Sequence, residues 1–308
     1  MKRSVLVADI GATKTRLVLV RKDGKLGAVR SVMNDDVTNL ETLLVDALST
    51  ARPRPQSAVL GIAGWIDGDH VLVTNRGWTF SRRALARTLG LKRLVAINDF
   101  EALAHGLPAL GKVDLVAVGT PHETPKVRLL VCGPGSGFGS ALLLKQGHRA
   151  QVLASEAGHM RLGAASADEA RVIAHFLRDN GPVVVEHLLS GPGLAYVHQV
   201  LSGERKRAEA IATAACAGEP TARATTDFFL RLFGRIAGDL ALAYNAKAVF
   251  LAGGVTRGLA PLIPNSQFRA AFEDHAPYRD RMALIPIKAI VHEEPGLFGA
   301  AQIARRLA

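Results

Sequence analysis

The chain has 308 residues, of which 48% are hydrophobic and 21% are charged. This balance allows a large core and excludes intrinsic disorder over most of the length. The two cysteines are too few for a disulfide framework or a four-thiolate zinc site.

The formal net charge of +11 raises the question of a nucleic-acid partner. The basic residues are scattered, however, and only 5% of residues are aromatic, so no stacking platform accompanies them. We interpret the charge as a solvated surface that attracts small anions, and we expect no nucleic-acid partner.

The apolar run Val5–Val7 is too short for a secretory signal, and the apolar stretch 129–144 is interrupted by glycines. We therefore expect a cytoplasmic protein without a membrane partner.

Two segments predict β-hairpins. Residues 5–20 contain two apolar strands around a small tip with Gly, Thr and Lys, and residues 129–144 repeat this design around a glycine-rich tip. The sequence identity between them is negligible. Their shared design predicts a fold of two related halves, each of which offers backbone N–H groups to phosphate.

Strands and helices alternate along the rest of the chain, which indicates an α/β fold with mixed sheets. Ser166 and Glu169 form a capping box that opens a helix ended by Gly181. Gly234 and Gly238, four residues apart in a long helix, would let another element approach that helix closely. The expected strands are 58–63, 94–97 and 248–252, and the expected helices are 81–89, 98–107, 166–180, 190–203, 221–245 and 295–306. No low-complexity linker marks a domain boundary, which we place near residues 110–111.

Several motifs fail on inspection. The glycines of residues 133–139 do not fit the G-x-G-x-x-G dinucleotide motif, because residue 138 is Phe and residue 140 is Ser. Residues 106–113 match a P-loop except at the last position, where Val113 cannot hold magnesium. Neither a G-x-S-x-G elbow nor an H-E-x-x-H pair occurs, so hydrolase and metalloprotease functions lose their support.

Polar residues at element ends remain as candidates. Asn98 and Asp99 follow an apolar strand and precede a helix. One interpretation is a plain N-cap, and the other is a functional carboxylate at the C-terminal end of a strand, where α/β folds place their sites. A helix N-terminus would keep Asp99 ionised and able to accept a proton.

Three further residues can be interpreted either as ordinary surface residues or as ligand-binding residues. Taken alone, Glu156 and His159 are more typical of a protein surface, and Glu186 is ambiguous. Together with Asn98 and Asp99 they match the vicinal hydroxyls of a sugar, while the glycine-rich tips match phosphates. The combination predicts phosphoryl transfer from a nucleotide to a polyol.

Sequence blocks over nearly the whole chain follow one another in the order of a known family. They are, in chain order, Asp9-Ile10-Gly11-Ala12-Thr13, Thr74-Asn75 with Trp78, Phe80 and Ser81, Ile97-Asn98-Asp99-Phe100, Gly133 to Gly139, Glu156-Ala157-Gly158-His159, Glu186 to Gly193, Leu251-Ala252-Gly253-Gly254-Val255, Phe268 to Asp274, and Pro295 to Ala301. In these blocks the chain resembles the bacterial glucokinase family, within the hexokinase–actin–Hsp70 superfamily. Each block is modest, and their joint order is highly specific.

The resemblance implies an α/β fold of the two-domain, actin-like (ribonuclease H-like) kind, with sugar and ATP in the interdomain cleft. We expect residues 1–110 plus 291–308 to form the small domain and residues 111–290 to form the large one. The implied activity is ATP-dependent phosphorylation of glucose to glucose 6-phosphate, which feeds glycolysis. ATP and Mg²⁺ are the implied cofactors, and we expect a homodimer.

By the same resemblance, Asp99 is the general base for the sugar 6-hydroxyl. Asn98, Glu156, His159 and Glu186 would hold the other hydroxyls, with the backbone of Gly137 nearby. Magnesium would bridge the ATP phosphates and be held through water near Asp9. The residues implied in ATP and phosphate binding are Asp9, Gly11, Ala12, Thr13, Lys14, Gly133, Gly135, Ser136, Gly253 and Gly254.

Three residues depart from the family pattern. Ala12 stands at a usual glycine, and would cost about 1 kcal/mol relative to Gly if this position needs a positive φ. Lys14 replaces an amide with a charge, and Trp65 replaces a proline. A kinase for another hexose or amino sugar therefore stays open as an alternative. The other alternative is a non-catalytic sugar sensor on the same fold, against which the presence of Asp99 speaks.

Overall fold

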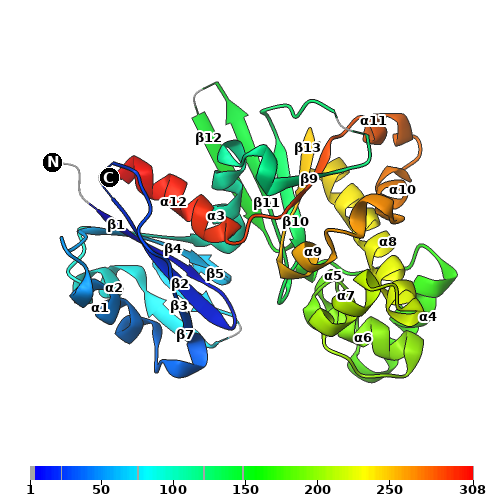
Figure 1. Ribbon diagram of the computed structural model, residues 1–308, viewed down its shortest axis with the longest axis horizontal. Helices are drawn as coiled ribbons and strands as arrows, with labels where there is room; N and C mark the ends of the chain where they lie inside the picture. The colour runs from blue at the N-terminus through cyan, green and yellow to red at the C-terminus, as the bar shows by residue number, and fades with distance from the viewer. Residues whose placement is uncertain (1–3, 22, 75, 121, 148, 308) are drawn as a thin grey trace. The chain divides into compact units, whose positions relative to one another are not determined.

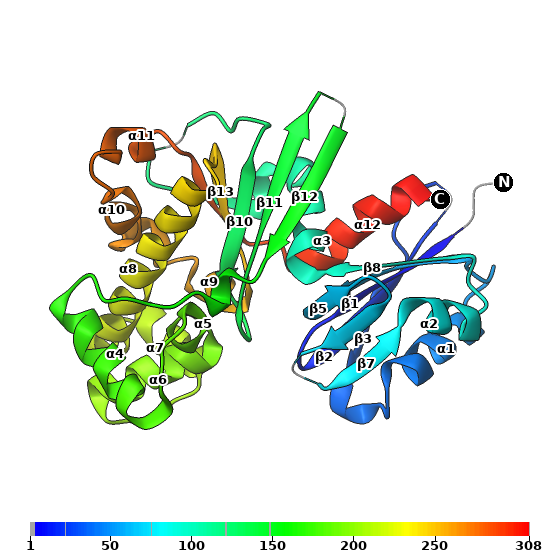
Figure 2. The same cartoon turned by 180° about the vertical axis from the view of Figure 1, so that it is seen from behind.

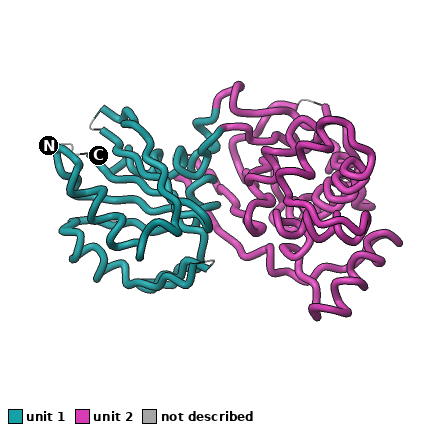
Figure 3. Tube along the Cα trace, turned by 60° about the horizontal axis from the view of Figure 1, so that its bottom comes forward, with its two compact units in different colours: residues 1–110, 293–308 teal, residues 111–292 magenta. Residues whose placement is uncertain are grey.

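The computed structural model describes residues 4–307 except residues 22, 75, 121 and 148, so Asn75 of the block above lies outside the described residues. The chain divides into two compact units, Met1–Leu110 with Glu293–Ala308 (unit 1) and Gly111–His292 (unit 2), coloured teal and magenta in Figure 3. Within the part of the chain that the structure describes, every helix is too short or too polar to cross a lipid bilayer.

Unit 1 is built from the N-terminal third of the chain and the C-terminal helix. Its elements are β1 (Val5–Ile10), β2 (Lys14–Val20), β3 (Arg30–Met33), the 3-10 helix η1 (Asn34–Asp36), α1 (Leu40–Thr50), β4 (Ser57–Ile62), β5 (Gly64–Asp67), β6 (His70–Val73), β7 (Trp78–Ser81), α2 (Arg82–Thr88), β8 (Arg93–Asn98), α3 (Asp99–Gly106), η2 (Leu107–Ala109) and α12 (Pro295–Leu307).

The main sheet of unit 1 has the strand order β3-β2-β1-β4-β8. Strands β1, β4 and β8 are parallel, and β1 forms an antiparallel hairpin with β2. Because side chains alternate along β1, Leu6 and Ile10 pack with leucines of α1 and α2, while Val5 and Val7 pack with α3 and α12. Figure 1 shows these helix pairs on opposite sides of the strands. The sheet is therefore covered on both faces.

Unit 2 begins with a strand-rich region and becomes mainly helical. Its elements are η3 (Lys112–Asp114), β9 (Leu115–Val118), β10 (Leu129–Pro134), β11 (Phe138–Gln146), β12 (Arg149–Ser155), η4 (Ala157–His159), α4 (Ala167–Asn180), α5 (Val185–Leu188), α6 (Gly191–Ser202), α7 (Ala208–Cys216), α8 (Pro220–Ala243), β13 (Ala248–Leu251), α9 (Gly254–Leu259), η5 (Ile263–Asn265), α10 (Phe268–Glu273), α11 (Arg279–Ala283) and β14 (Ile287–Ile290).

The sheet of unit 2 has the strand order β12-β11-β10-β13-β14-β9, and Figure 2 shows β10, β11 and β12 side by side. As in unit 1, an antiparallel hairpin extended by a third strand lies beside two parallel strands. The second predicted hairpin is thus confirmed, and it occupies the same place in its sheet as the first. The two main sheets share this five-strand arrangement, to which unit 2 adds the antiparallel strand β9.

Helix α8 carries the glycines that were expected to permit a close approach. A Cβ on Gly234 would lie 2.1 Å from the carbonyl oxygen of Phe268, and one on Gly238 would lie 2.7 Å from that of Phe272. Both partners belong to α10, so the expectation is confirmed. The packing buries Phe268 and Phe272 completely.

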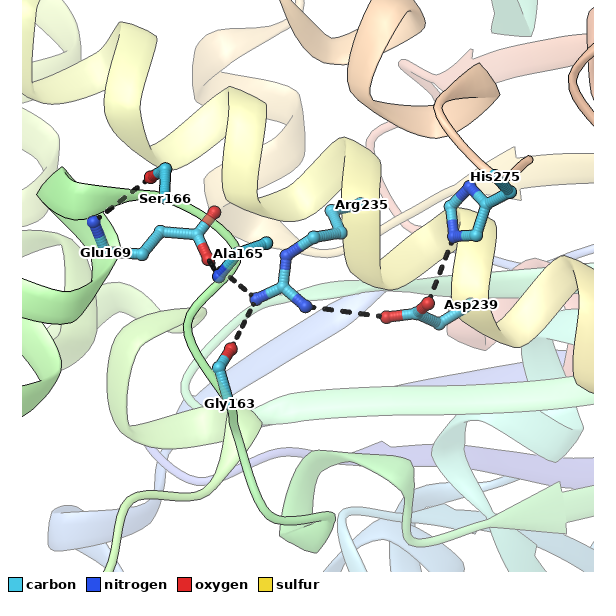
Figure 4. Close-up of polar contacts among 7 residues, drawn as sticks. All are labelled: Gly163, Ala165, Ser166, Glu169, Arg235, Asp239 and His275. Carbon is cyan, nitrogen blue, oxygen red and sulfur yellow. Dashed lines mark hydrogen bonds and ion pairs between the residues drawn. The ribbon is translucent and has the colours of Figure 1, made fainter.

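The capping box at α4 is confirmed in only one of its two bonds. Ser166 Oγ accepts a hydrogen bond from the N–H of Glu169 at 3.2 Å. The carboxylate of Glu169 does not return to the N-cap; it accepts from the N–H of Ala165 and from Arg235 of α8, at 2.8 and 2.9 Å. Figure 4 shows that Arg235 continues this network to Asp239, which meets His275. Glu169 therefore joins α4 to α8, which explains why this glutamate is buried.

Candidate functional site

The candidate residues of unit 1 lie at one edge of its sheet. The parallel register aligns Ile10 of β1 with Ile62 of β4, and Ile62 with Asn98 of β8. The first hairpin tip and the Asn98–Asp99 pair therefore follow strands that end at the same level. This is the carboxyl edge, where parallel sheets place their binding sites.

Asn98 caps helix α3, and Asp99 is the first residue of the helix. Asn98 Oδ1 accepts hydrogen bonds from the N–H groups of Phe100 and Glu101, at 2.8 and 3.3 Å. The N–H of Phe100 also reaches Asp99 Oδ1 at 2.9 Å. The capping interpretation is thus confirmed for Asn98. Both of these cap bonds use Oδ1, and neither involves the Nδ2 of Asn98.

The tip of the first hairpin spans Gly11 to Lys14, and the N–H of Gly11 donates to the carbonyl of Lys14 at 3.2 Å. Among the described residues other than glycine, only Arg128 and Asn245 have a positive φ. Ala12 therefore adopts an ordinary backbone conformation, and the strain considered for this position does not arise. Alanine replaces glycine here without a conformational cost.

Asp9 and Arg16 face each other across the hairpin and form an ion pair at 3.4 Å, with both side chains 15% exposed. Arg16 also pairs with Glu294, which immediately precedes α12. Burial raises the pKa of Asp9 to about 6, against the opposing effect of Arg16 and with a smaller rise from Glu294. Arg16 was not among the predicted site residues, because its role depends on the strand register that pairs it with Asp9.

A magnesium ion is implied by the resemblance, and its expected holder is Asp9. Among the described residues, no cluster of three or more His, Cys, Asp or Glu side chains is arranged to hold a metal. Mg²⁺ is often bound by one or two carboxylates together with water and substrate phosphates. The single, mostly buried carboxylate of Asp9 beside the hairpin tip fits an ion that is bound together with the nucleotide.

In unit 2, the second hairpin packs against the Gly253–Gly254 segment. Gly253 has φ +102°, and a Cβ on it would lie 2.1 Å from the carbonyl oxygen of Pro134. The tip is also tied to α6, because the N–H of Gly191 donates to the carbonyl of Gly135 at 2.8 Å. Gly133, Gly135, Ser136, Gly253 and Gly254 are thus brought together within this unit. At Gly133, as at Gly253, a Cβ would collide with a neighbouring carbonyl oxygen, 2.0 Å away in Ala252, so the close packing requires glycine at these two positions.

The candidate sugar residues of unit 2 gather around Phe138. Glu186 Oε2 accepts from the N–H of Phe138 at 2.9 Å, and a Cβ on Gly137 would lie 2.1 Å from the same oxygen. A Cβ on Gly158 would lie 2.5 Å from the carbonyl oxygen of Phe138. Gly158 belongs to the loop of Glu156 and His159. The structure therefore places this loop, Gly137 and Glu186 against one strand end.

Glu156 and His159 are exposed at this place, whereas Glu186 is partly buried. His159 N–H donates to the carbonyl of Glu156 at 3.0 Å, which closes the turn that carries both side chains. Lys14 is partly buried, and Trp65 is 56% exposed on β5. The side chains of Glu156 and His159 are thus accessible to a ligand.

The family model and the curated relatives indicate the same family. The family model described as Glucokinase matches residues 6–307. A glucokinase of Mesorhizobium japonicum is 32% identical over 98% of this chain and 91% of its own length. A glucokinase structure from an Antarctic psychrotroph is 28% identical, with a TM-score of 0.84 over 99% of this chain and 100% of its own. The glucokinase of Balamuthia mandrillaris in complex with glucose is 22% identical and shares the fold, with a TM-score of 0.85 over 99% of this chain and 94% of its own.

Proposed function

The chain belongs to the glucokinase family, and we propose that it phosphorylates glucose on its 6-hydroxyl with ATP, giving glucose 6-phosphate for glycolysis. As a member of this family it is an ATP-dependent hexose kinase. The observation that carries the mechanism is the common edge in unit 1, where the hairpin tip and Asp99 follow aligned parallel strands.

In this mechanism Asp99 accepts the proton of the sugar 6-hydroxyl. The oxygen then attacks the γ-phosphorus of ATP, and ADP leaves. The N-terminus of α3 favours an anion at this position, because the positive end of the helix dipole lies there and the N–H of Phe100 donates to Asp99 Oδ1. Asn98 keeps its Nδ2 available for a neighbouring sugar hydroxyl while its Oδ1 caps the helix.

The remaining sugar contacts are assigned to unit 2. Carboxylates accept hydrogen bonds from hydroxyls, and Glu156, Glu186 and His159 together provide acceptors and a donor for vicinal hydroxyls. The proposal is supported by their shared position around Phe138. The backbone at Gly137 lies in contact with Glu186, and so belongs to the same surface.

Phosphate binding is assigned to both hairpin tips. Gly11, Ala12, Thr13 and Lys14 would serve unit 1, while Gly133, Gly135, Ser136, Gly253 and Gly254 would serve unit 2. Magnesium, when bound, neutralises phosphate charge, and Asp9 would hold it through water. We further propose the actin-like arrangement of the family, with sugar and ATP in a cleft between a small and a large domain, in a cytoplasmic homodimer.

The test is a coupled ADP-release assay with glucose, mannose, fructose, glucosamine and N-acetylglucosamine. We expect the highest kcat/KM with glucose. A higher value with another sugar would support the alternative of a different hexose or amino-sugar kinase, for which the departures at Ala12, Lys14 and Trp65 are the reason. Sugar binding without ADP release on any of them would support a non-catalytic sensor.

A further inference from the structure

Asn34 is a fully buried asparagine behind the tip of the first hairpin. It begins η1 directly after β3, and its side chain has no solvent exposure. A buried amide must satisfy two donors and an acceptor within the protein. Where these bonds go therefore shows what the residue does.

Asn34 binds three of the four carbonyl groups of the tip, those of Gly11, Ala12 and Thr13. Its Nδ2 donates to the carbonyl oxygens of Gly11 and Ala12, at 2.8 and 3.3 Å. Its own N–H donates to the carbonyl of Thr13 at 2.8 Å. One residue thus holds three successive peptide groups of the tip by their oxygens.

This arrangement determines which way the N–H groups point. A peptide group carries its N–H opposite to its C=O, so carbonyls turned toward Asn34 direct N–H groups away from it. In the part of the chain that the structure describes, no acceptor bonds to the N–H of Ala12 or Thr13. A run of unpaired N–H groups in a turn is an anion-binding concavity.

The amide of Asn34 is itself fixed in one orientation. The buried hydroxyl of Thr15 donates to Asn34 Oδ1 at 2.8 Å, which leaves Nδ2 facing the tip. Arg76 Nη2 donates to the Asn34 carbonyl at 2.9 Å, while its Nη1 forms an ion pair with Asp35. Both ends of Asn34 are therefore anchored to the rest of unit 1.

We propose that Asn34 is the positioning residue of the first phosphate loop: it holds the tip so that the N–H groups of Ala12 and Thr13 face the outer phosphates of the nucleotide. The inference rests on the proposed function for ATP as the ligand. Asn34 touches no phosphate itself. Its effect reaches the nucleotide through the backbone of the tip.

The test compares two nucleotides that differ in their phosphates. The Kd values of AMPPNP and AMP, both with Mg²⁺, and of glucose are measured by calorimetry for wild type, Asn34→Ala and Asn34→Asp. Aspartate keeps the size and the acceptor for Thr15 but sets an oxygen against two carbonyls. We expect both variants to bind AMPPNP about tenfold more weakly, because loss of preoriented donors removes about 1–2 kcal/mol at a charged ligand. AMP and glucose affinities should change by less than about twofold.

The matched control is Asn39→Ala, which removes another asparagine of the same segment. Asn39 is exposed and caps α1 by accepting from Thr42 N–H at 2.9 Å, without contact to the tip. It should lower the thermal midpoint while leaving the ratio of AMPPNP to AMP affinity unchanged.

An unchanged ratio in a folded Asn34 variant, or an equal loss for AMPPNP, AMP and glucose, overturns the proposal. If neither Asn34 variant folds, Thr15→Val decides, since it frees the amide at nearly constant volume. It should weaken AMPPNP at least about threefold more than AMP, and no difference would reject the role. A wild type that binds AMPPNP no better than AMP would instead refute the ATP site of the proposed function.

Discussion

Asn98 and Asp99 are adjacent but have different roles: Asn98 caps helix α3, and Asp99 is the proposed general base. The oxygen of Asn98 completes the helix cap, and the N–H of Phe100 is shared between both side chains. An asparagine at position 99 would keep the shape and the hydrogen-bonding group. It would remove the negative charge and with it the capacity to take a proton, and it would replace one acceptor oxygen by an NH₂ donor.

We therefore expect Asp99→Asn to retain glucose binding and to lose turnover. Removal of a general base typically costs about 10²–10⁴-fold in rate, or roughly 3–5 kcal/mol of barrier. Steady-state kinetics and glucose calorimetry on the same preparation separate the two effects. A kcat near that of wild type would remove Asp99 from the mechanism.

Ionisation of the buried Asp9 carboxyl lowers the free energy of unfolding, so the effect of this residue on stability depends on pH. Its pKa in the folded chain is about 6, above the ordinary value of 3.8, so the folded state holds the proton more tightly than the unfolded state does. The protonated form is thus favoured by folding, and stability is lost as pH rises through 6. The shift corresponds to about 3 kcal/mol once the group is ionised in both states.

Asp9→Asn should accordingly raise the free energy of unfolding by about 3 kcal/mol above pH 7, measured without nucleotide or metal. Because asparagine imitates the protonated acid, the gain should shrink between pH 6 and pH 4. Denaturant unfolding of both proteins across this range gives the difference directly. A gain that is the same at pH 4 and pH 8 would show that ionisation of Asp9 is not its source.

The residues that the sequence revealed and those that it hid differ in a physical way. Asn98 and Asp99 follow an apolar strand and open a helix, and both signals are local. Asn34 and Arg16 act through partners that are distant in the chain or opposite in a hairpin. Their roles depend on strand register and on burial, neither of which a single sequence displays.

At the level of elements, Gly137 allows the tip of the second hairpin to pack closely against Glu186 of helix α5. An added Cβ would meet only the carboxylate end of Glu186, which is flexible and can move at little cost to stability. Moving it would break its bond with the N–H of Phe138.

Gly137→Ala should therefore raise the KM for glucose at least about tenfold, since a hydrogen bond to a charged group contributes about 1.5–3 kcal/mol. The thermal midpoint should change little. Gly163→Ala is the control, because a Cβ there meets nothing within 4 Å. Unchanged glucose kinetics in Gly137→Ala would separate Glu186 from the sugar.

Gly234 of α8 presents the opposite case, because its neighbour is backbone. A Cβ would lie 2.1 Å from the carbonyl oxygen of Phe268, which cannot move without shifting α10. We expect Gly234→Ala to destabilise by about 2 kcal/mol or more and to lower the thermal midpoint by about 4–8 °C. Gly258→Ala in helix α9 should be neutral or stabilising, because its Cβ would be 3.7 Å from that of Ala212. Equal midpoints for the two variants would contradict the close approach.

The elements that the sequence predicted are those with strong local signals. The hairpins, the cap at Ser166, and the helix ends at Gly181 and Gly203 follow from periodicity and from glycine or capping chemistry. The small sheet of β5, β6 and β7 was not predicted, because its four-residue strands are too short to show a period. The hydrogen bond from Arg235 to Glu169 was also not predicted, because 66 residues separate the two in the sequence.

At the scale of the whole molecule, each unit has a hairpin beside parallel strands, and we propose that the two hairpin tips present backbone donors to phosphate. The charge of the molecule acts in addition to these donors. A net charge of +11 attracts an anionic nucleotide over a distance of about 10 Å at 0.1 M salt and has no comparable effect on a neutral sugar. Added salt should therefore raise the KM for ATP and leave the KM for glucose unchanged.

Substitution of Lys14 can distinguish the electrostatic field of the whole protein from a direct contact between the Lys14 ammonium and the ATP phosphates. Its side chain starts at the first residue of β2, next to the tip, and is partly buried, whereas Lys112 of unit 2 is exposed. Each replacement by asparagine removes one charge from the same total. If the Lys14 ammonium meets the ATP phosphates, Lys14→Asn should raise the KM for ATP about fivefold or more at low salt, because a lysine binds phosphate as a point charge. It should also weaken the salt dependence, while Lys112→Asn should do neither. Equal ATP kinetics for the two variants at low and at high salt would assign Lys14 to the general field alone.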